Sequence, residues 1–386
     1  MTVPVLIAAL SGRALAAAAR RSGYDPLVLD LFDDADTQVL ARRSAQVAGS
    51  IDEGLSEEAL IAAAEAIAPL AHYPKIDLVC GSGFEDRPSV LARLASGRRL
   101  RGNPPELVAR TKNPRDFFAT LDRLGIPHPA VRFAPTADTD DWLVKRIGAS
   151  GGAHIQAAND DVAAGQERYF QRRVSGRPLS LLFLANGVRA LPLGFSEQWS
   201  AQEAGYLFGG AVRPASLPAR RAADLAAAVQ ALTVEFGLLG LNSADVLLRD
   251  DGFDLLEINP RPGATLDIFD HVGDLFALHC RACAGDLPQG WQQAVEASAC
   301  AVFYAPCPIV VPQDISWPSW AADLPHGGTE IDAGAPVCTV FAQDNSAAAA
   351  RALVKARGGE ILSLLEAESR RGAPWKAGFA VEAAQS

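Results

Sequence analysis

Two acids and an amide in the middle of the chain have the residue types and spacing of a magnesium site. Asp245 and Glu257 lie in two apolar runs, 244–248 and 253–258, which are separated by Arg-Asp-Asp-Gly. An Asp-Gly pair between two such runs is typical of a β-hairpin. Folding the chain at this turn brings both acids to the same end of the paired strands, close to Asn259. Carboxylate and amide oxygens suit Mg²⁺, which binds few protein carboxylates and leaves positions for substrate phosphates.

An ordinary polar hairpin on the surface is the alternative interpretation of this segment. It is disfavoured because Glu257 and Asn259 lie within an apolar arm, where a solvated acid is not expected. Arg261 follows two residues later. Its planar guanidinium pairs well with phosphate, so we expect it to brace an anion held by the metal.

A lysine at the end of a short apolar run gives a second candidate site. The run 142–145 predicts a strand that ends at Lys145, and the loop after it contains Gly148, Ser150, Gly151 and Gly152. Glycine lets backbone amides approach an anion closely, so this loop is a candidate phosphate cradle. It is not a Walker A loop, because the order GxxxxGK is absent. The six histidines show no metal-ligand spacing and are interpreted as structural, with His154 beside this loop as the exception.

The elements that must position these residues begin with a strand-helix alternation in the first hundred residues. Apolar runs at 3–10, 26–31 and 76–80 alternate with helix-like stretches at 13–21 and 56–70. This order predicts a parallel sheet with helices on both faces, and therefore an α/β fold.

Ligands of parallel sheets lie beyond the carboxyl ends of the strands, where Ser11-Gly12 and Gly81-Ser82-Gly83 are expected. Neither glycine pair completes GxGxxG, so a dinucleotide-binding dehydrogenase is disfavoured. Glu85, which follows the second group, is a candidate contact for a substrate amine. A polar loop with a helix cap is the alternative.

Beyond a Pro-containing boundary at 102–105, the chain reads as a mixture of helices and strands. We expect helices at 114–124, 219–236, 275–284 and 345–357, two strands within 168–185, and short strands at 301–304, 309–311, 330–331 and 337–341. Arg213 is a candidate contact for a phosphate or carboxylate. Asp267, just past the hairpin, is a candidate amine contact, and a helix cap is its alternative.

Composition excludes several function classes. The 386 residues are 49% hydrophobic, which is ample for the cores of two or three domains. The formal net charge of −10 argues against a nucleic-acid partner, which needs clustered Lys and Arg. The first apolar run has no positive residue before it and is too short to span a bilayer. We therefore expect a cytoplasmic protein with no membrane partner.

Taken in order, these features resemble the ATP-grasp superfamily of carboxylate-amine ligases. The resemblance is carried by Lys112, by Lys145 before its glycine-rich loop, by a hinge at 171–174, and by the hairpin acids. It runs from about residue 102 to residue 270. It implies an N-terminal parallel α/β domain at 1–103, a two-lobed nucleotide domain at 104–275 and a small α+β closing segment at 276–386. The central lobe is expected at about 130–185 and the metal-binding hairpin at 241–267.

The resemblance also implies roles for individual residues. ATP would lie between the two lobes, with Lys112 and Lys145 on its phosphates and the hinge residues Gln171, Arg172 and Val174 at the adenine. Asp245, Glu257 and Asn259 would hold Mg²⁺, or Mn²⁺ in its place. Arg261 and Lys145 would be the catalytic residues. Two positions depart from the pattern: Gln171 stands where Glu is frequent, and Pro178 stands where many members have a ribose-binding Glu.

Within the superfamily, four segments resemble relatives of the tyramine–glutamate ligase of methanofuran and methylofuran biosynthesis: GSGFEDRP, LRGNPPE, GRPLSLLFLANG and LEINPRPGATLDIFD. This implies a ligase that joins a carboxylate, glutamate or another amino acid, to an amine through an acyl phosphate. The pathway would be methylofuran or tetrahydromethanopterin biosynthesis, and the resemblance favours a homodimer. Two alternatives stay open, a carboxylase-type enzyme that activates bicarbonate and a non-catalytic ATP-binding protein.

Overall fold

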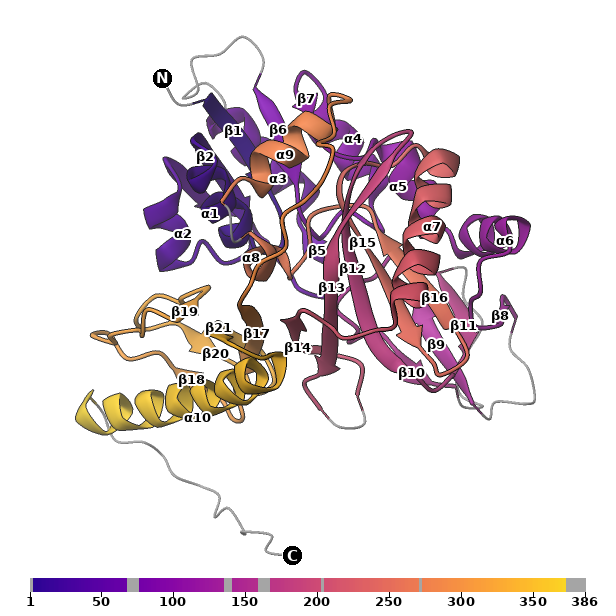
Figure 1. Ribbon diagram of the computed structural model, residues 1–386. Coiled ribbons are helices and arrows are strands. Elements are labelled where there is room, and N and C mark those ends of the chain that lie inside the picture. The colour runs from indigo at the N-terminus through magenta and orange to yellow at the C-terminus, as the bar shows by residue number, and fades with distance from the viewer. Residues whose placement is uncertain are drawn as a thin grey trace, which may run out of the picture.

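The computed structural model describes residues 3–67, 76–134, 141–158, 167–202, 205–270 and 273–372, with side chains up to residue 367 (Figure 1). The end of the helix predicted over 56–70 and two of the histidines, His72 and His271, lie outside these ranges.

The N-terminal region forms a parallel five-stranded sheet, as predicted. Its strands are β1 (Val3–Ala8), β2 (Tyr24–Asp30), β3 (Arg43–Gln46), β6 (Asp77–Cys80) and β7 (Arg99–Leu100), in the order β3-β2-β1-β6-β7. Successive side chains of a strand point to opposite faces. Val5 and Ile7 accordingly pack with α1 (Arg13–Arg21), whereas Leu6 and Ala8 pack with α3 (Glu57–Ile67) and α4 (Pro88–Ala95). Both faces are therefore covered, which explains the continuous apolar run of β1. Two short elements, α2 (Ala35–Leu40) and the β4–β5 pair (Gly49–Ser50, Gly54–Leu55), lie in the connections.

Two helices and a small antiparallel sheet follow. The helices are α5 (Pro105–Lys112) and α6 (Pro114–Leu124), and the strands are β8 (Val131–Arg132), β9 (Trp142–Arg146), β10 (Gln156–Ala157) and β11 (Arg168–Arg172). The strand order is β10-β9-β11-β8. The next strand, which begins within the central lobe predicted at about 130–185, pairs in a different sheet.

An eight-stranded antiparallel sheet forms the largest layer, in the order β16-β15-β12-β13-β14-β17-β21-β19. Its strands are β12 (Arg177–Asn186), β13 (Ala190–Ser200), β14 (Phe208–Arg213), β15 (Leu239–Leu248), β16 (Phe253–Asn259), β17 (Ala297–Tyr304), β19 (Ala321–Ala322) and β21 (Pro336–Asp344). The strands β17, β19 and β21 of the predicted closing segment thus extend the sheet that carries the hairpin. The predicted boundary near residue 275 falls within one continuous sheet.

Helices cover this large sheet. α7 (Ala219–Phe236) packs Leu225, Val229 and Leu232 against Leu181 and Phe183 of β12. α10 (Ala347–Gly372) lies along β17 and β21 at the C-terminal end of the sheet (Figure 1). The remaining elements are α8 (Leu266–Phe269), α9 (Leu275–Ala282) and the β18–β20 pair (Ile309–Val310, Glu330–Ile331).

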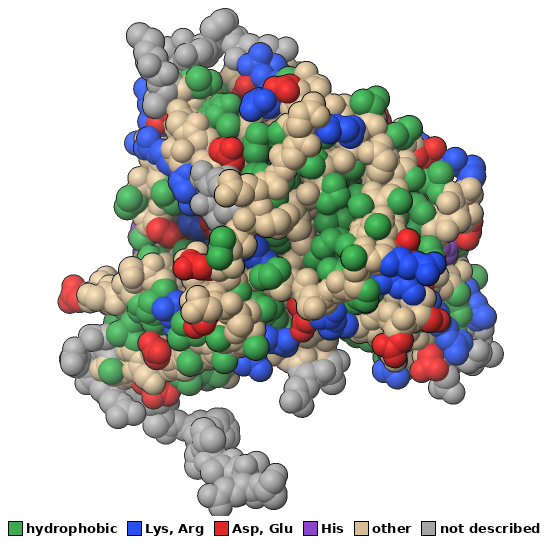
Figure 2. All heavy atoms as spheres, in the orientation of Figure 1, with side chains coloured by type: hydrophobic (Ala, Val, Ile, Leu, Met, Phe, Trp, Pro, Cys, Tyr) green, Lys and Arg blue, Asp and Glu red, His purple; other side chains and the backbone are tan. Residues whose placement is uncertain are grey.

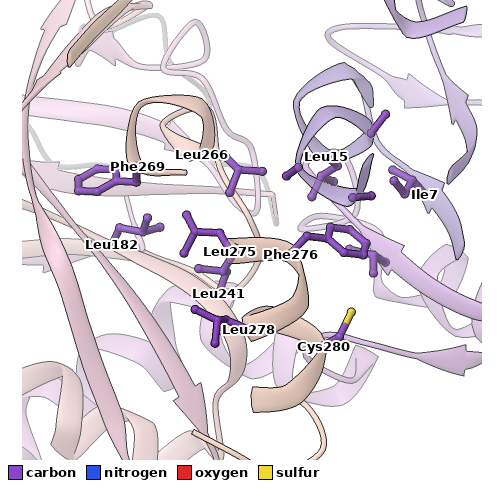
Figure 3. Packing of buried hydrophobic residues seen from close by; sticks show 14 of the residues in the cluster. Ile7, Leu15, Leu182, Leu241, Leu266, Phe269, Leu275, Phe276, Leu278 and Cys280 are labelled. Atoms are coloured by element: carbon purple, nitrogen blue, oxygen red, sulfur yellow. The ribbon is translucent and has the colours of Figure 1, made fainter. Parts of the chain in front are cut away.

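One hydrophobic core joins the N-terminal sheet to the large sheet. Figure 3 shows Ile7 and Leu15 of the N-terminal region facing Phe276 of α9, while Leu182 and Leu241 of the large sheet lie on the other side of that helix. Burial of a side chain such as Phe276 contributes about 1.5–3 kcal/mol to folding. The carboxyl ends of β1 and β6 are thereby held against the hairpin.

Acidic and basic side chains are interspersed on the face shown in Figure 2. None of the helices in the described ranges is long and apolar enough to cross a membrane.

Candidate active site

The hairpin of β15 and β16 places Asp245 and Glu257 side by side. The two residues are direct partners in the antiparallel register, next to a bulge after Asp245. Directly paired residues have their side chains on the same face of a sheet. On its other side Asp245 is paired with Ser180 of β12. The predicted hairpin and the proximity of the two acids are confirmed.

Asn259 and Lys112 complete this arrangement. The side-chain amide of Asn259 donates to Asp245 Oδ2 at 2.9 Å and to Glu257 Oε1 at 3.3 Å. Lys112 Nζ donates to Glu257 Oε2 at 2.9 Å and to Asn259 Oδ1 at 2.8 Å. Lys112 is the last residue of α5, a helix that the sequence did not predict. With Lys145, these four side chains are called the acid–lysine site below.

Lys145 reaches the site from the small sheet. Its side chain is buried, and it forms none of the hydrogen bonds or ion pairs found among the described residues. Burial lowers the pKa of Lys145, while Glu257 and Asp245 raise it in part. Tyr169 of β11 is the direct partner of Lys145, and Gln171, two residues further along β11, is the partner of Leu143. Gln171 and Lys145 therefore lie on the same face of this sheet.

The two carboxyl groups have opposite pKa shifts. Burial, together with the charge of Glu257, raises the pKa of Asp245 to about 6. Burial also opposes ionisation of Glu257, but Lys112 and Lys145 outweigh it and lower the pKa of Glu257 to about 2. Asp245 Oδ1 is buried without a hydrogen-bond partner among the described residues.

The side-chain oxygens of Asp245, Glu257 and Asn259 fit a divalent cation whose remaining coordination positions are filled by water and substrate oxygens. No group of three or more His, Cys, Asp or Glu side chains in the described part of the chain is arranged to hold a metal by itself. The carboxylates of Asp245 and Glu257 and the amide oxygen of Asn259 suit Mg²⁺, which keeps positions for water and phosphate. The Oδ1 atom of Asp245 is the one of these oxygens that is buried and unbonded among the described residues. A structural zinc site would need a closed set of protein ligands.

Residues 148–152 form a loop, as predicted, and two of its glycines, Gly148 and Gly152, are required by close contacts. Gly148 has φ +74°, and a Cβ there would lie 2.6 Å from the Cα of Asp86. Gly152 has φ +83°, and a Cβ there would lie 1.8 Å from the carbonyl oxygen of Tyr206. The loop thus passes between the N-terminal region and the segment before β14. His154, just after it, keeps Nδ1 buried without a described partner, and burial lowers the pKa of His154 to about 4.

Glu85 and Arg261 form a buried ion pair next to the acid–lysine site. Arg261 Nε donates to Glu85 Oε1 at 2.7 Å, and Glu85 Oε2 accepts from the backbone amides of Gly83 and Phe84. Burial opposes ionisation of Glu85, but Arg261 and Lys112 outweigh it and lower its pKa. A small pocket beside the pair is lined mainly by apolar side chains, including Phe84, Leu91, Leu100, Val108 and Leu241.

The sequence matches the family model of the ATP-grasp domain over residues 112–265. The matched range begins at Lys112 and includes Lys145, the glycine-rich loop and the whole hairpin. This chain carries an ATP-grasp domain. No curated protein matches the chain.

Solved structures share the fold of the ATP-grasp domain and of its flanking regions. The biotin carboxylase domain of *Hydrogenobacter thermophilus* 2-oxoglutarate carboxylase, a dimer in complex with MgADP, ADP and bicarbonate, has a TM-score of 0.67 at 14% identity, over 88% of this chain and 86% of that one. N5-carboxyaminoimidazole ribonucleotide synthetase from *Thermotoga maritima* has a TM-score of 0.65 at 15% identity, over 93% and 98%. Biotin carboxylase from *Campylobacter jejuni*, in a β,γ-ATP complex, has a TM-score of 0.68 at 14% identity, over 88% and 87%.

The predicted hinge lies at the end of β11 in the ATP-grasp domain. Gln171 is buried, and its Nε2 has no hydrogen-bond partner among the described residues. Arg172 donates its backbone amide to Ala130 and lies over the ring of Trp142. Val174 follows the strand and is partly buried. A buried amide without a partner is unusual in a folded protein, so Gln171 is available to a ligand.

Two predicted substrate contacts are engaged elsewhere. The guanidinium of Arg213 donates to the backbone carbonyls of Ile268 and Glu296. Asp267, in the first turn of α8, forms an ion pair with Arg13 at 2.8 Å. Neither residue has a described contact with the acid–lysine site, so their roles toward substrate stay predictions. Glu85, the third such residue, contacts Arg261 as described above.

Sequence reasoning missed Ser180 and Tyr169. Ser180 faces Asp245 because β12 pairs with β15, and these strands are more than fifty residues apart in the chain. Tyr169 is partly buried opposite Lys145, and desolvation, together with Glu257, raises its pKa. The alternation of Tyr169 with Gln171 along one strand is the signal that could have identified it.

Proposed function

We propose that this protein is an ATP-dependent ligase that activates a carboxylate as an acyl phosphate and joins it to an amine. The observation that carries the proposal is the acid–lysine site on the ATP-grasp domain, with Asp245 Oδ1 buried and unbonded beside it. Two lysines, two carboxylates and an amide from three separate parts of the chain meet there.

In this proposal ATP lies between the small sheet and the hairpin. Lys112 and Lys145 contact its phosphates, the loop with Gly148, Ser150, Gly151 and Gly152 covers them, and Gln171, Arg172 and Val174 contact the adenine. Asp245, Glu257 and Asn259 hold Mg²⁺, and Mn²⁺ has the same ligand preference. When bound, the metal neutralises charge on the β- and γ-phosphates.

The protein side chains position the reactants and balance charge. A substrate carboxylate oxygen attacks the γ-phosphorus, the bond to the β–γ bridging oxygen breaks, and ADP leaves. The amine nitrogen then attacks the acyl carbon, phosphate leaves, and the proton lost by the nitrogen passes to the released phosphate. Lys145 stabilises the transferring phosphoryl group, and Arg261, held by Glu85, stabilises the acyl phosphate. In this proposal the unbonded Oδ1 of Asp245 is one of the metal ligands.

The finer proposal names the substrates. The acid is glutamate or another amino acid, the amine is aromatic, and the product belongs to methylofuran or tetrahydromethanopterin biosynthesis. Support comes from the four sequence segments given above. Two of them supply Glu85 and Arg261, which flank the apolar pocket.

A carboxylase-type reaction on bicarbonate is the second candidate. It is favoured by the likeness to the biotin carboxylase domain in complex with bicarbonate, which extends over 88% of this chain. Phosphate release that requires bicarbonate, and not an amino acid with an amine, would select this candidate.

The deciding experiment is a thermal-shift titration with ATP and Mg²⁺ on the wild type and on Glu257→Gln. Ligand binding to the folded state at a hundredfold excess over Kd adds about 2.7 kcal/mol of stability. We expect the wild type to shift and the variant to lose most of the metal-dependent shift. Glu360→Gln, an exposed change on α10, is the matched control.

Phosphate release with glutamate and an aromatic amine then tests turnover. A wild type that does not shift with ATP and Mg²⁺ would overturn the proposal. A shift without phosphate release from any acid, amine or bicarbonate would leave a non-catalytic ATP-binding protein.

A further inference from the structure

A second cluster of charges lies at the carboxyl edge of the N-terminal sheet, where β1 and β2 end. Seven carboxylates gather there against two arginines, Arg13 and Arg21; the carboxylates belong to Asp30, Asp33, Asp34, Asp36, Asp267, Asp270 and Asp323. Arg13 is buried and pairs with Asp267 at 2.8 Å, with Asp323 at 3.0 Å and with Asp36 at 3.9 Å.

Three of these acids, Asp30, Asp33 and Asp36, accept hydrogen bonds from backbone amides or from a side-chain amide. Asp30 accepts from Gly12, Phe32 and Asp33. Asp36 accepts from the amides of Asp323 and Leu324. Asp33 accepts from Gln38 through Oδ2, but its Oδ1 is buried without a described partner.

Asp34 is the exception in this cluster. It is 6% exposed and stands at the N-cap of α2, yet its side chain makes no cap hydrogen bond. In the described part of the chain it has no hydrogen bond or ion pair through its carboxyl group. Asp323, Asp30 and Asp36 face it, and Arg13 is the opposite charge nearby. An acid buried without a partner is costly and calls for a cation or a proton.

We propose that Asp34 marks a binding subsite for a protonated organic amine. This rests on the proposed ligase function, and it places a protonated amino group of the amine substrate, other than the one that attacks the acyl phosphate, at the edge of the N-terminal sheet. A metal ion is disfavoured, because the carboxylates around Asp34 already pair with Arg13 or accept from backbone amides. An ammonium group instead donates up to three separate hydrogen bonds and tolerates wider spacing.

The position of this subsite fits a substrate that also reaches the acid–lysine site. β2 and β6 are the two neighbours of β1, so the residues that follow them lie at the same carboxyl edge of the sheet. Asp34 follows β2, and Glu85 follows β6. The segment from Arg261 to Asp267 also links the two places, since Arg261 contacts Glu85 and Asp267 contacts Arg13.

The protonation of Asp34 supports this assignment. Burial, and after it the charge of Asp323, raises the pKa of Asp34 to about 8. An ammonium ion bound there favours the ionised carboxylate, so binding displaces a proton from Asp34. Amine affinity should therefore rise from pH 7 to pH 9, below the pKa of the amine itself.

The test is isothermal titration calorimetry of the full chain with 1,4-diaminobutane, with 1,4-butanediol as the uncharged control. We expect the diamine alone to bind and Asp34→Asn to weaken it at least tenfold. The control variant is Asp251→Asn, whose side chain is 82% exposed, and it should bind as the wild type does. Equal affinity in Asp34→Asn, equal binding of the diol, or no binding to the wild type would each overturn the proposal.

Two further measurements distinguish a loss of the amine subsite from a loss of folding or of nucleotide binding. Titration in two buffers of different ionisation enthalpy should show proton release on diamine binding to the wild type and none in Asp34→Asn. The ATP and Mg²⁺ thermal shift on the same samples reports folding and the proposed function independently. Nucleotide binding without diamine binding overturns the amine subsite alone, and absence of nucleotide binding overturns the ligase function.

Discussion

Each charged side chain of the acid–lysine site shifts the pKa of its neighbours. Lys112 has the largest effect of the cations that lower the pKa of Glu257 to about 2. Lys112→Met removes that charge, so the pKa of Glu257 should rise by more than one unit toward or above its ordinary value. Carboxyl-carbon NMR titration measures this directly. Lys355→Met, an exposed change on α10, should leave the titration as in the wild type; an unchanged pKa in Lys112→Met would contradict the site geometry.

The Glu85–Arg261 pair lies away from water, so its loss should be costly. Glu85 is 4% exposed and Arg261 is 15% exposed as side chains. Glu85→Gln leaves the arginine without its counter-charge, which should cost about 3 kcal/mol of the free energy of unfolding. Urea unfolding provides the measurement.

The matched control is an exposed Arg–Glu pair, Arg93 with Glu57 at 2.8 Å. Because such pairs contribute about 0–1 kcal/mol, Glu57→Gln should change stability little. Equal effects of the two substitutions on the free energy of unfolding would show that burial of the Glu85–Arg261 pair does not increase its contribution to stability. Glu85→Gln should also slow turnover, because Arg261 loses its position, while nucleotide binding stays close to wild type.

The glycine-rich loop offers a comparison between neighbouring residues. Gly151 and Gly152 have φ +77° and +83°, but only at Gly152 would a Cβ meet another atom, the carbonyl oxygen of Tyr206 at 1.8 Å. Alanine at either position bears left-handed backbone strain of about 1–2 kcal/mol. Gly152→Ala should in addition displace the loop from the segment before β14.

We therefore expect Gly152→Ala to weaken ATP affinity by tenfold or more, and Gly151→Ala to weaken it by clearly less. Calorimetric titration of both variants with ATP and Mg²⁺ measures the difference. If both variants bound ATP equally, docking of the loop on Tyr206 would have no part in nucleotide binding.

The molecule as a whole should lose stability in mildly alkaline solution. Burial raises the pKa of Asp30 to about 6 and that of Asp34 to about 8. Because folding raises these pKa values, the native state binds more protons than the unfolded chain. Their contribution is complete below the unfolded pKa of about 3.9 and is lost as the pH rises through 6 and 8.

Other acids act in the opposite direction at low pH. The pKa values of Glu85, Glu257 and Asp323 are lowered by neighbouring cations that outweigh burial, so their contribution is present above the unfolded pKa and is lost on acidification. The free energy of unfolding should therefore be greatest near pH 5. Urea unfolding at pH 5, 7 and 9 tests this. Asp34→Asn should gain stability relative to the wild type as the pH rises from 5 to 9; a pH profile identical to that of the wild type would contradict the buried charge.

The sequence by itself determined the local elements and the main pair of acids. The helices at 13–21, 114–124 and 219–236 have the bounds predicted from apolar periodicity and from their flanking glycines and prolines. The hairpin was predicted because its turn and its alternation lie within thirty residues. Asp245 and Glu257 are paired by that local geometry alone.

Only the tertiary structure decided which distant side chains meet. Lys112 joins Glu257 across 145 positions, Glu85 joins Arg261 across 176, and Arg13 joins Asp323 across 310. Strand pairing between distant segments is likewise set by packing, which is why β17, β19 and β21 extend the large sheet instead of forming a separate layer. Periodicity and turn chemistry report only on near neighbours in the chain, whereas these contacts depend on the burial of whole faces.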